Sequence, residues 1–222
     1  MSKSPAPRLY LVTPPLADSA RFLPALEAAL GEADIAAVLL RLDAAGAAGA
    51  VDERTLINRT KAIAAVVQRR DVALVLDGHA ELAARTGADG AHLTGIETFA
   101  AALALLKPER IAGAGGLRSR HDAMLAAEAG ADYVMFGEPD RNGRRLSFAE
   151  TVERLTWWAD LLEVPCVAYA ASTEEVAPLA QTGADFVALG DWLWREPQVA
   201  AALAAASAAM AAAAKHDDTV TR

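Results

Sequence analysis

Arg41 and Asp77 are the two charged residues that most directly indicate chemistry on an anion or a metal ion. Arg41 lies near the end of a strongly apolar segment, 35–42, and Asp77 follows a second one, 72–76. Because a buried guanidinium is costly unless it is paired or binds a ligand, we favour an anion-binding role for Arg41 over a structural ion pair. Asp77 could hold Mg²⁺ or cap the helix that follows, and the sequence favours neither alternative.

Two further segments have the composition of phosphate-binding loops. Gly115 and Gly116 precede a predicted helix that begins at Arg118, so their backbone N–H groups suit a phosphate, although any pair of glycines can also form a tight turn. The loop 138–145 carries three arginines that could close over a pyrophosphate, Arg141, Arg144 and Arg145. A solvated turn at Asn142-Gly143 is an equally good interpretation of this loop.

His92 and Cys166 point to structure rather than to a site. His92 falls inside a predicted strand, 89–93, and we interpret it as a core histidine with one hydrogen-bond partner. Cys166 is the single cysteine, which excludes an internal disulfide and a cysteine-rich zinc site.

The elements that position these residues are marked by a unit that occurs three times. Its copies read Gly87-Ala88-Asp89, Gly130-Ala131-Asp132 and Gly183-Ala184-Asp185. In each copy an apolar helical segment ends at the Gly, which takes the left-handed cap conformation at little cost. A short apolar run with the length of a buried strand follows. A helix that leads into a buried strand, repeated, is typical of a parallel α/β fold.

The whole chain of 222 residues divides into eight predicted strands that alternate with eight helices. This count predicts an α/β fold, a single (β/α)8 TIM barrel, with an open doubly wound sheet as the alternative. We place an N-terminal arm at 1–8, the barrel with its Ala-rich last helix at 9–214, and a disordered tail at 215–222. In such a barrel the chemistry lies at the carboxyl ends of the strands, and Gly190, after strand eight, is a further candidate for phosphate binding.

Composition narrows the classes of function. The formal net charge of −8 disfavours a surface for nucleic acid or an anionic membrane. No segment has the length and apolar character of a transmembrane helix, and the N-terminus lacks the pattern of a signal peptide. We therefore expect a cytoplasmic protein.

Several segments together resemble thiamine-phosphate synthase and its TenI-like relatives. They are Tyr10-Leu11-Val12-Thr13, Val38-Leu39-Leu40-Arg41, Gly87-Ala88-Asp89-Gly90-Ala91-His92-Leu93, Gly130-Ala131-Asp132-Tyr133-Val134 and Gly183-Ala184-Asp185-Phe186-Val187-Ala188. The resemblance implies a TIM barrel that joins hydroxymethylpyrimidine pyrophosphate to thiazole phosphate. It also implies Mg²⁺ and basic side chains that stabilise the departing pyrophosphate.

The sequence departs from the family's motifs at several positions. The family's Gln-x-Arg-x-Lys segment reads Leu39-Leu40-Arg41-Leu42-Asp43, and its Asn-Asp pair reads Asp77-Gly78. Glu97 stands where the family has a metal-binding Asp, so the resemblance implies Arg41, Asp77 and Glu97 as catalytic residues, the two acids being the Mg²⁺ ligands. The family's Gly-Gly phosphate turn reads Ala170-Ala171, followed by Ser172, and its last-strand Ser is Gly190. The implied phosphate site therefore combines Gly115, Gly116, Arg118, Arg141, Arg144, Arg145, Ala171, Ser172 and Gly190.

Three functions fit a chain that keeps the segments of the family's barrel but changes several of its site residues. The chain is a divergent thiamine-phosphate synthase, an enzyme that acts on another phosphorylated heterocycle, or a non-catalytic barrel that binds a phosphorylated ligand or a protein partner. Small phosphorylated heterocycles are the expected ligands. A homo-oligomer is possible, because Trp157, Trp158, Trp192 and Trp194 could either pack a subunit interface or cover the barrel's own helices.

Overall fold

The protein is described here from a computed structural model, which covers residues 6–44, 50–140 and 142–220. Its strands are β1 (Arg8–Val12), β2 (Ile35–Leu40), β3 (Ala73–Asp77), β4 (Gly90–Thr94), β5 (Ile111–Gly115), β6 (Tyr133–Phe136), β7 (Cys166–Ala170) and β8 (Phe186–Leu189). Its α-helices are α1 (Ser19–Glu32), α2 (Glu53–Val67), α3 (Ala80–Thr86), α4 (Ile96–Leu106), α5 (Arg120–Glu128), α6 (Phe148–Leu161), α7 (Thr173–Ala180) and α8 (Val199–Val220).

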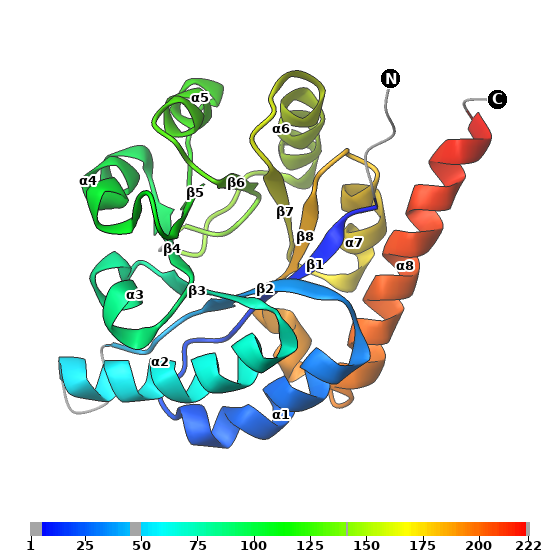
Figure 1. Cartoon of the computed structure of the whole chain (residues 1–222). Helices are drawn as coiled ribbons and strands as arrows, with labels where there is room; N and C mark the ends of the chain where they lie inside the picture. Colours follow the sequence, from blue (N-terminus) through cyan, green and yellow to red (C-terminus); the bar gives the residue numbers. More distant parts are fainter. Residues whose placement is uncertain (1–5, 45–49, 141, 221–222) are drawn as a thin grey trace.

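The strands form a closed barrel in sequence order, with β8 pairing with β1 (Figure 1). Every strand pair is parallel, so the carboxyl ends of all strands meet at one end of the barrel. The helices surround the strands, and α8 packs against α7 and α1 (Figure 1). The predicted TIM barrel is confirmed, and the open sheet is excluded.

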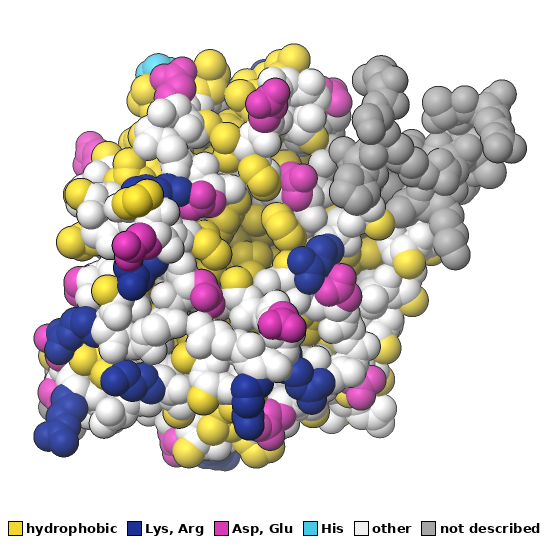
Figure 2. Space-filling view, viewed as in Figure 1, with side chains coloured by type: hydrophobic (Ala, Val, Ile, Leu, Met, Phe, Trp, Pro, Cys, Tyr) yellow, Lys and Arg dark blue, Asp and Glu magenta, His cyan; other side chains and the backbone are white. Residues whose placement is uncertain are grey.

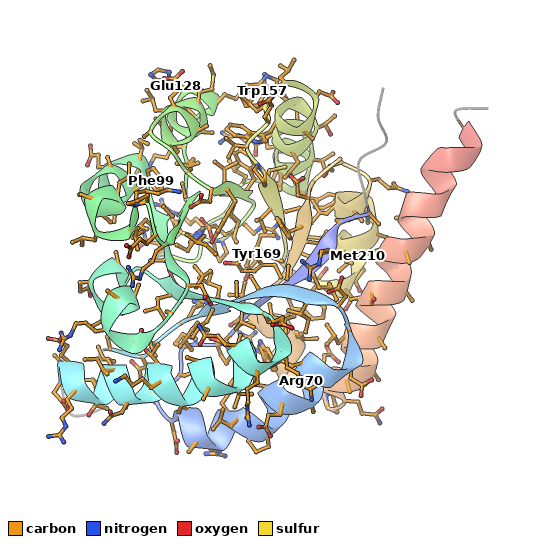
Figure 3. All side chains as sticks on the ribbon, viewed as in Figure 1. Arg70, Phe99, Glu128, Trp157, Tyr169 and Met210 are labelled. Atoms are coloured by element: carbon orange, nitrogen blue, oxygen red, sulfur yellow. The ribbon has the colours of Figure 1, made fainter. Side chains whose placement is uncertain are left out.

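Side chains of the strands divide between two cores, as alternation along a strand requires. One set points outward and packs against the helices, and it makes up the larger hydrophobic core. The other set fills the barrel itself and includes Tyr10, Tyr133 and Tyr169. Tyr169 lies near the centre of the barrel in Figure 3. The barrel interior therefore carries hydroxyl groups as well as apolar side chains.

The repeated unit has the local structure that its glycines predict. Gly87, Gly130 and Gly183 follow α3, α5 and α7 with φ values of 76°, 104° and 84°. The aspartate that follows in each copy has a role that the sequence did not predict. Each one accepts a hydrogen bond from a backbone N–H of the preceding strand: Asp89 from Leu74, Asp132 from Ala112, and Asp185 from Cys166. These bonds tie neighbouring strands together at the amino ends of the strands, away from the end where barrels carry their chemistry.

Some predicted boundaries differ from the structure. Gly31 predicts the end of the first helix, but α1 continues to Glu32, because a glycine near a helix end need not take the left-handed conformation. Strand β2 ends at Leu40, so Arg41 lies just beyond it rather than inside it. Helix α8 extends to Val220, six residues beyond the predicted end at Ala214, since no Gly or Pro interrupts it. The residue types at two helix starts predict N-caps, and both are present: Asp52 caps α2, and Ser147 with Glu150 forms a capping box at α6.

The tryptophans cover the barrel's own elements. Trp158 is fully buried and donates its indole N–H to the Val164 carbonyl oxygen at 2.7 Å. Trp192 and Trp194 donate to the carbonyl oxygens of Ala170 and Val12. Trp157 is partly buried on α6, with the Arg120 guanidinium 4.7 Å from its ring (Figure 3). Three of the four indole N–H groups thus donate hydrogen bonds to carbonyl oxygens of the same chain.

The surface carries charges of both signs, interspersed over the helices in the view of Figure 2. Among the described residues, no helix is long and apolar enough to cross a membrane.

Candidate active site

A cavity of about 740 Å³ opens where β4, β5 and β6 end. The turn after β4, the loop after β5 and the loop after β6 form its walls. This end of a TIM barrel is where active sites form, because eight loops converge there. Five of the residues predicted for the site line the cavity: Glu97, Gly116, Arg118, Arg144 and Arg145. Arg141 lies outside the described residues.

At the base of this cavity, Glu138 forms a buried pair with His92. The Nε2 atom of His92 lies 3.0 Å from Oε2 of Glu138, and their side chains are 1% and 11% exposed. The other ring nitrogen, Nδ1, lies 3.0 Å from the Tyr133 hydroxyl, which in turn lies 2.9 Å from the Tyr10 hydroxyl. A hydrogen-bonded chain of four side chains therefore runs from the cavity into the barrel.

The sequence-based interpretation of His92 is wrong in one respect, since the imidazole has two partners rather than one. Burial opposes the charged form of His92, but the carboxylate of Glu138, the hydrogen bond between them and the more distant Asp77 outweigh burial. The pKa of His92 is therefore raised above its ordinary value. Burial is also the main reason that the pKa values of Tyr10 and Tyr133 are raised, so both phenols stay protonated at neutral pH.

Gly115 is what makes room for the Glu138 carboxylate. A Cβ atom at Gly115 would overlap Oε1 of Glu138 and would lie 2.5 Å from Nε2 of His92. Gly115 is the last residue of β5, and its carbonyl oxygen accepts a hydrogen bond from the Gly95 N–H at 2.7 Å. A carboxylate thus lies against the glycine that was predicted to bind phosphate. Gly116, by contrast, lines the cavity, with a φ of 59° that suits glycine.

Arg41 and Asp77, predicted separately from the sequence, are brought together by β2 and β3. The Nε atom of Arg41 lies 3.4 Å from Oδ2 of Asp77, and each side chain is about one third exposed, at 32% and 33%. Neither residue lines the cavity at β4–β6. The charge of Asp77 nevertheless acts on Tyr10, Tyr133 and His92, and that of Arg41 acts on Tyr169. The ion pair and the base of the cavity share one electrostatic environment.

The arginines around the cavity differ in whether they are paired. Arg145 makes two hydrogen bonds to the Glu175 carboxylate, at 2.9 and 3.0 Å. Arg144 is exposed and lies 3.3 Å from Asp140, whose pKa is lowered first of all by the backbone N–H of Arg144. The guanidinium of Arg118 has no hydrogen bond or ion pair with the residues that the structure describes. Among the described arginines that line the cavity, Arg118 is therefore the one free to bind an anionic ligand.

Glu175, the partner of Arg145, also accepts a hydrogen bond from the turn after β7. The Ala171 N–H, predicted to bind phosphate, donates to Oε2 of Glu175 at 2.8 Å. Ser172 precedes α7 but makes no side-chain cap, and its hydrogen bond to Glu174 lowers the pKa of that exposed carboxyl. Gly190, after β8, lies under the Tyr169 ring, and a Cβ atom there would be 2.5 Å from the Tyr169 hydroxyl oxygen. Ala171, Ser172 and Gly190 lie at the same end of the barrel, outside the cavity.

The donor set of the site can be compared with what Mg²⁺ prefers. Asp77 and Glu97 offer carboxylate oxygens, the ligands that suit this ion, and Glu97 has no hydrogen bond or ion pair within the described part of the chain. No group of three or more acidic, His or Cys side chains that could hold a metal ion exists among the described residues. Mg²⁺ commonly binds through one or two carboxylates together with substrate phosphates. These residues therefore fit the ion only if substrate oxygens complete its shell.

His92 and Glu138 were not predicted as site residues. A single histidine inside an apolar strand has the same pattern as a core residue, and Glu138 follows β6 with no motif around it. The signal that could have found them is their position near the carboxyl ends of strands, because His92 lies within β4 and Glu138 two residues after the end of β6.

Comparison with known proteins identifies the family of the chain. The model of one protein family, described as thiamine monophosphate synthase, matches residues 9–192. The chain belongs to this family. A thiamine-phosphate synthase of Rhodospirillum centenum is 41% identical over 201 residues, which cover 89% of this chain and 94% of that protein. A second one, of Hyphomonas neptunium, is 39% identical, with 90% and 92% of the two chains covered.

The fold of the family is found among solved structures as well. A thiamine phosphate pyrophosphorylase from Pyrococcus furiosus superposes with a TM-score of 0.74 over 93% of this chain and 96% of that one, at 20% sequence identity. At this identity the likeness establishes the barrel alone. The resemblance on which the family was suggested from the sequence is therefore confirmed.

Proposed function

We propose that the chain is a thiamine-phosphate synthase, which condenses hydroxymethylpyrimidine pyrophosphate with thiazole phosphate to give thiamine phosphate and pyrophosphate. Membership in the thiamine monophosphate synthase family supports the reaction. The observation that carries the proposal is the cavity after β4–β6, which combines three arginines with the carboxylate of Glu97. It is large enough for a small phosphorylated heterocycle. We place this function in the cytoplasm.

The cavity has groups that complement the two charges formed in the reaction, the pyrophosphate anion and the pyrimidine cation. The bond between the pyrimidine methylene carbon and the pyrophosphate oxygen breaks, and the electron pair leaves with the pyrophosphate. The thiazole nitrogen then gives its lone pair to the methylene carbon. Arg118, Arg144 and Arg145 would bind the departing anion, and apolar side chains such as Leu117 and Phe136 would keep water from the cation.

Mg²⁺ would be held by Glu97 and Asp77 together with phosphate oxygens of the substrate. When bound, it would neutralise charge that builds up on the pyrophosphate. Arg41 lies beside Asp77, outside the cavity, so it would hold that carboxylate in place.

The second candidate, a barrel that binds another phosphorylated ligand without synthase activity, is favoured by Glu175. Its carboxylate already occupies the Arg145 guanidinium and the Ala171 N–H, two groups predicted to bind phosphate. A chain with these groups neutralised internally has less charge available for a pyrophosphate.

The two candidates are distinguished by product formation. The purified chain is incubated with Mg²⁺ and both substrates, and thiamine phosphate is measured by mass spectrometry beside an active family member. We expect thiamine phosphate and pyrophosphate in equal amounts, with formation abolished by chelation of Mg²⁺. Stabilisation of the chain by pyrophosphate in a thermal melt, without product, would instead support the second candidate.

A further inference from the structure

One oxygen of the Glu138 carboxylate is buried without a hydrogen-bond partner. Oε2 lies 3.0 Å from His92 Nε2, whereas Oε1 contacts no donor among the described residues. A buried carboxylate oxygen that accepts no hydrogen bond is costly, because it has lost its water and gained nothing in return. Such a group in a functional cavity indicates a donor that arrives with a ligand.

The position of the Glu138 carboxylate depends on the absence of a side chain at Gly115. Glu138 reaches His92 only because Gly115 has no side chain, since any Cβ atom there would overlap Oε1. Oε1 is buried against Gly115, and the broad last torsion of a glutamate side chain lets the carboxylate rotate toward a donor that enters the cavity. Glu138 is one of the residues that line the cavity.

Apolar side chains share the cavity with this carboxylate and favour a ligand with an apolar ring. Ile96, Leu117, Met135 and Phe136 line the same cavity. A buried carboxylate oxygen without a partner among the described residues, in a cavity that also offers apolar side chains, suits a flat ring that carries an N–H donor on its edge. Of the two heterocycles in the proposed reaction, only the aminopyrimidine has such a donor, because the thiazole nitrogen carries no hydrogen.

We propose that Glu138 binds the exocyclic amino group of the pyrimidine substrate and thereby selects an aminopyrimidine for this cavity. This assignment rests on the proposed function and names the residue that recognises the ring. The amino N–H donates to Oε1, so every atom of the carboxylate is then satisfied. A negative charge beside the amino group also stabilises the positive charge that develops on the ring as pyrophosphate departs. The residue therefore contributes to both binding and catalysis.

The test compares two ligands on four proteins, namely wild type, two Glu138 variants and one control variant. Hydroxymethylpyrimidine monophosphate, which lacks the leaving pyrophosphate, and its analogue with hydrogen in place of the amino group are titrated calorimetrically into wild type, Glu138→Gln and the exposed control Glu128→Gln. We expect wild type and the control to prefer the amino ligand by about 10- to 100-fold, the range of a charge-assisted hydrogen bond. Glu138→Gln retains an acceptor without the charge, so its preference should fall to about fivefold.

Glu138→Met, which has no acceptor, should show no preference, and circular dichroism checks that both variants are folded. Equal binding of the two ligands by wild type would overturn the assignment, as would a wild-type preference that persists in Glu138→Gln and Glu138→Met. Either result leaves the synthase proposal intact, because the pyrimidine still binds. If neither ligand binds wild type, the proposed function itself fails and the assignment fails with it.

Discussion

Arg118 and Arg145 carry the same charge at the same cavity but differ in what they are free to bind. Arg145 is held by two hydrogen bonds to Glu175, while Arg118 has no partner among the described residues. The sequence predicts both as phosphate ligands, because it shows the residue type and the position after a strand. It does not show the partner, since Glu175 lies thirty residues away and meets Arg145 only after β6 and β7 pair.

Removal of the Glu175 charge should strengthen phosphate binding. In Glu175→Gln the Arg145 guanidinium loses its ion-pair partner and can turn toward an anion in the cavity. We expect the affinity for pyrophosphate, measured by calorimetry with Mg²⁺, to rise by about three- to tenfold. The neighbouring exposed carboxylate gives a matched control, Glu174→Gln, which should bind as wild type does. Unchanged or weaker binding by Glu175→Gln would contradict this role of Glu175.

The titration of His92 should report its pairing with Glu138. Its pKa is raised in the folded chain, so the pair stabilises the fold fully below the unfolded value of about 6.5, and this contribution is lost as pH rises through the higher folded value. In Glu138→Gln burial remains but the attraction is gone, so we expect the pKa of His92 to fall below 6.5. NMR titration of the imidazole signals, with His92→Gln to assign the resonance, measures both values. A wild-type His92 that titrates below 6.5 would count against the pairing.

The elements were predicted more completely than the side-chain contacts. Helical periodicity, the glycines at 87, 130 and 183 and the short apolar runs between them predict the strand and helix order that the structure has. Most boundaries moved by one or two residues and the end of α8 by six, since the end of a helix or strand depends on its tertiary contacts. The aspartates of the repeated unit were noticed as a pattern, but their bonds to the preceding strand could not be predicted without the register between strands.

The end of strand β5 should tolerate no side chain at Gly115. In Gly115→Ala the new Cβ would overlap the Glu138 carboxylate and push it away from His92. We expect this variant to lose about 1–3 kcal/mol of unfolding free energy, measured by urea denaturation. It should also lose the raised pKa of His92.

The matched control for this substitution is Gly31→Ala, because no atom lies within 4 Å of a Cβ placed at Gly31 in α1. Its unfolding free energy should stay unchanged or rise by no more than about 1 kcal/mol. A Gly115→Ala variant as stable as Gly31→Ala would show that the carboxylate does not depend on this gap.

At the scale of the whole molecule, barrel closure explains why residues far apart in the sequence form one site. The carboxyl ends of parallel strands meet at one end, so Arg41, Asp77, His92 and Glu138 share an electrostatic environment across almost one hundred residues. The sequence predicts the barrel and predicts that the site lies at the carboxyl ends of its strands. It does not predict the separation of the Arg41–Asp77 pair from the cavity at β4–β6, because the shape of a cavity depends on all the loops around it. A homo-oligomer remains a prediction.

The measurement that tests the account most directly is the rate of thiamine phosphate formation by wild type and Arg118→Ala. Both substrates and Mg²⁺ are supplied, product is followed by mass spectrometry, and Arg70→Ala, remote from the cavity on the short helix after α2, serves as the control. We predict steady product formation by wild type and the control, and a loss of about a hundredfold or more in Arg118→Ala, because the free cation at the cavity then no longer stabilises the departing pyrophosphate. Wild type that forms no product beside an active family member, or Arg118→Ala that works as fast as wild type, would contradict the assignment of synthase chemistry to this cavity.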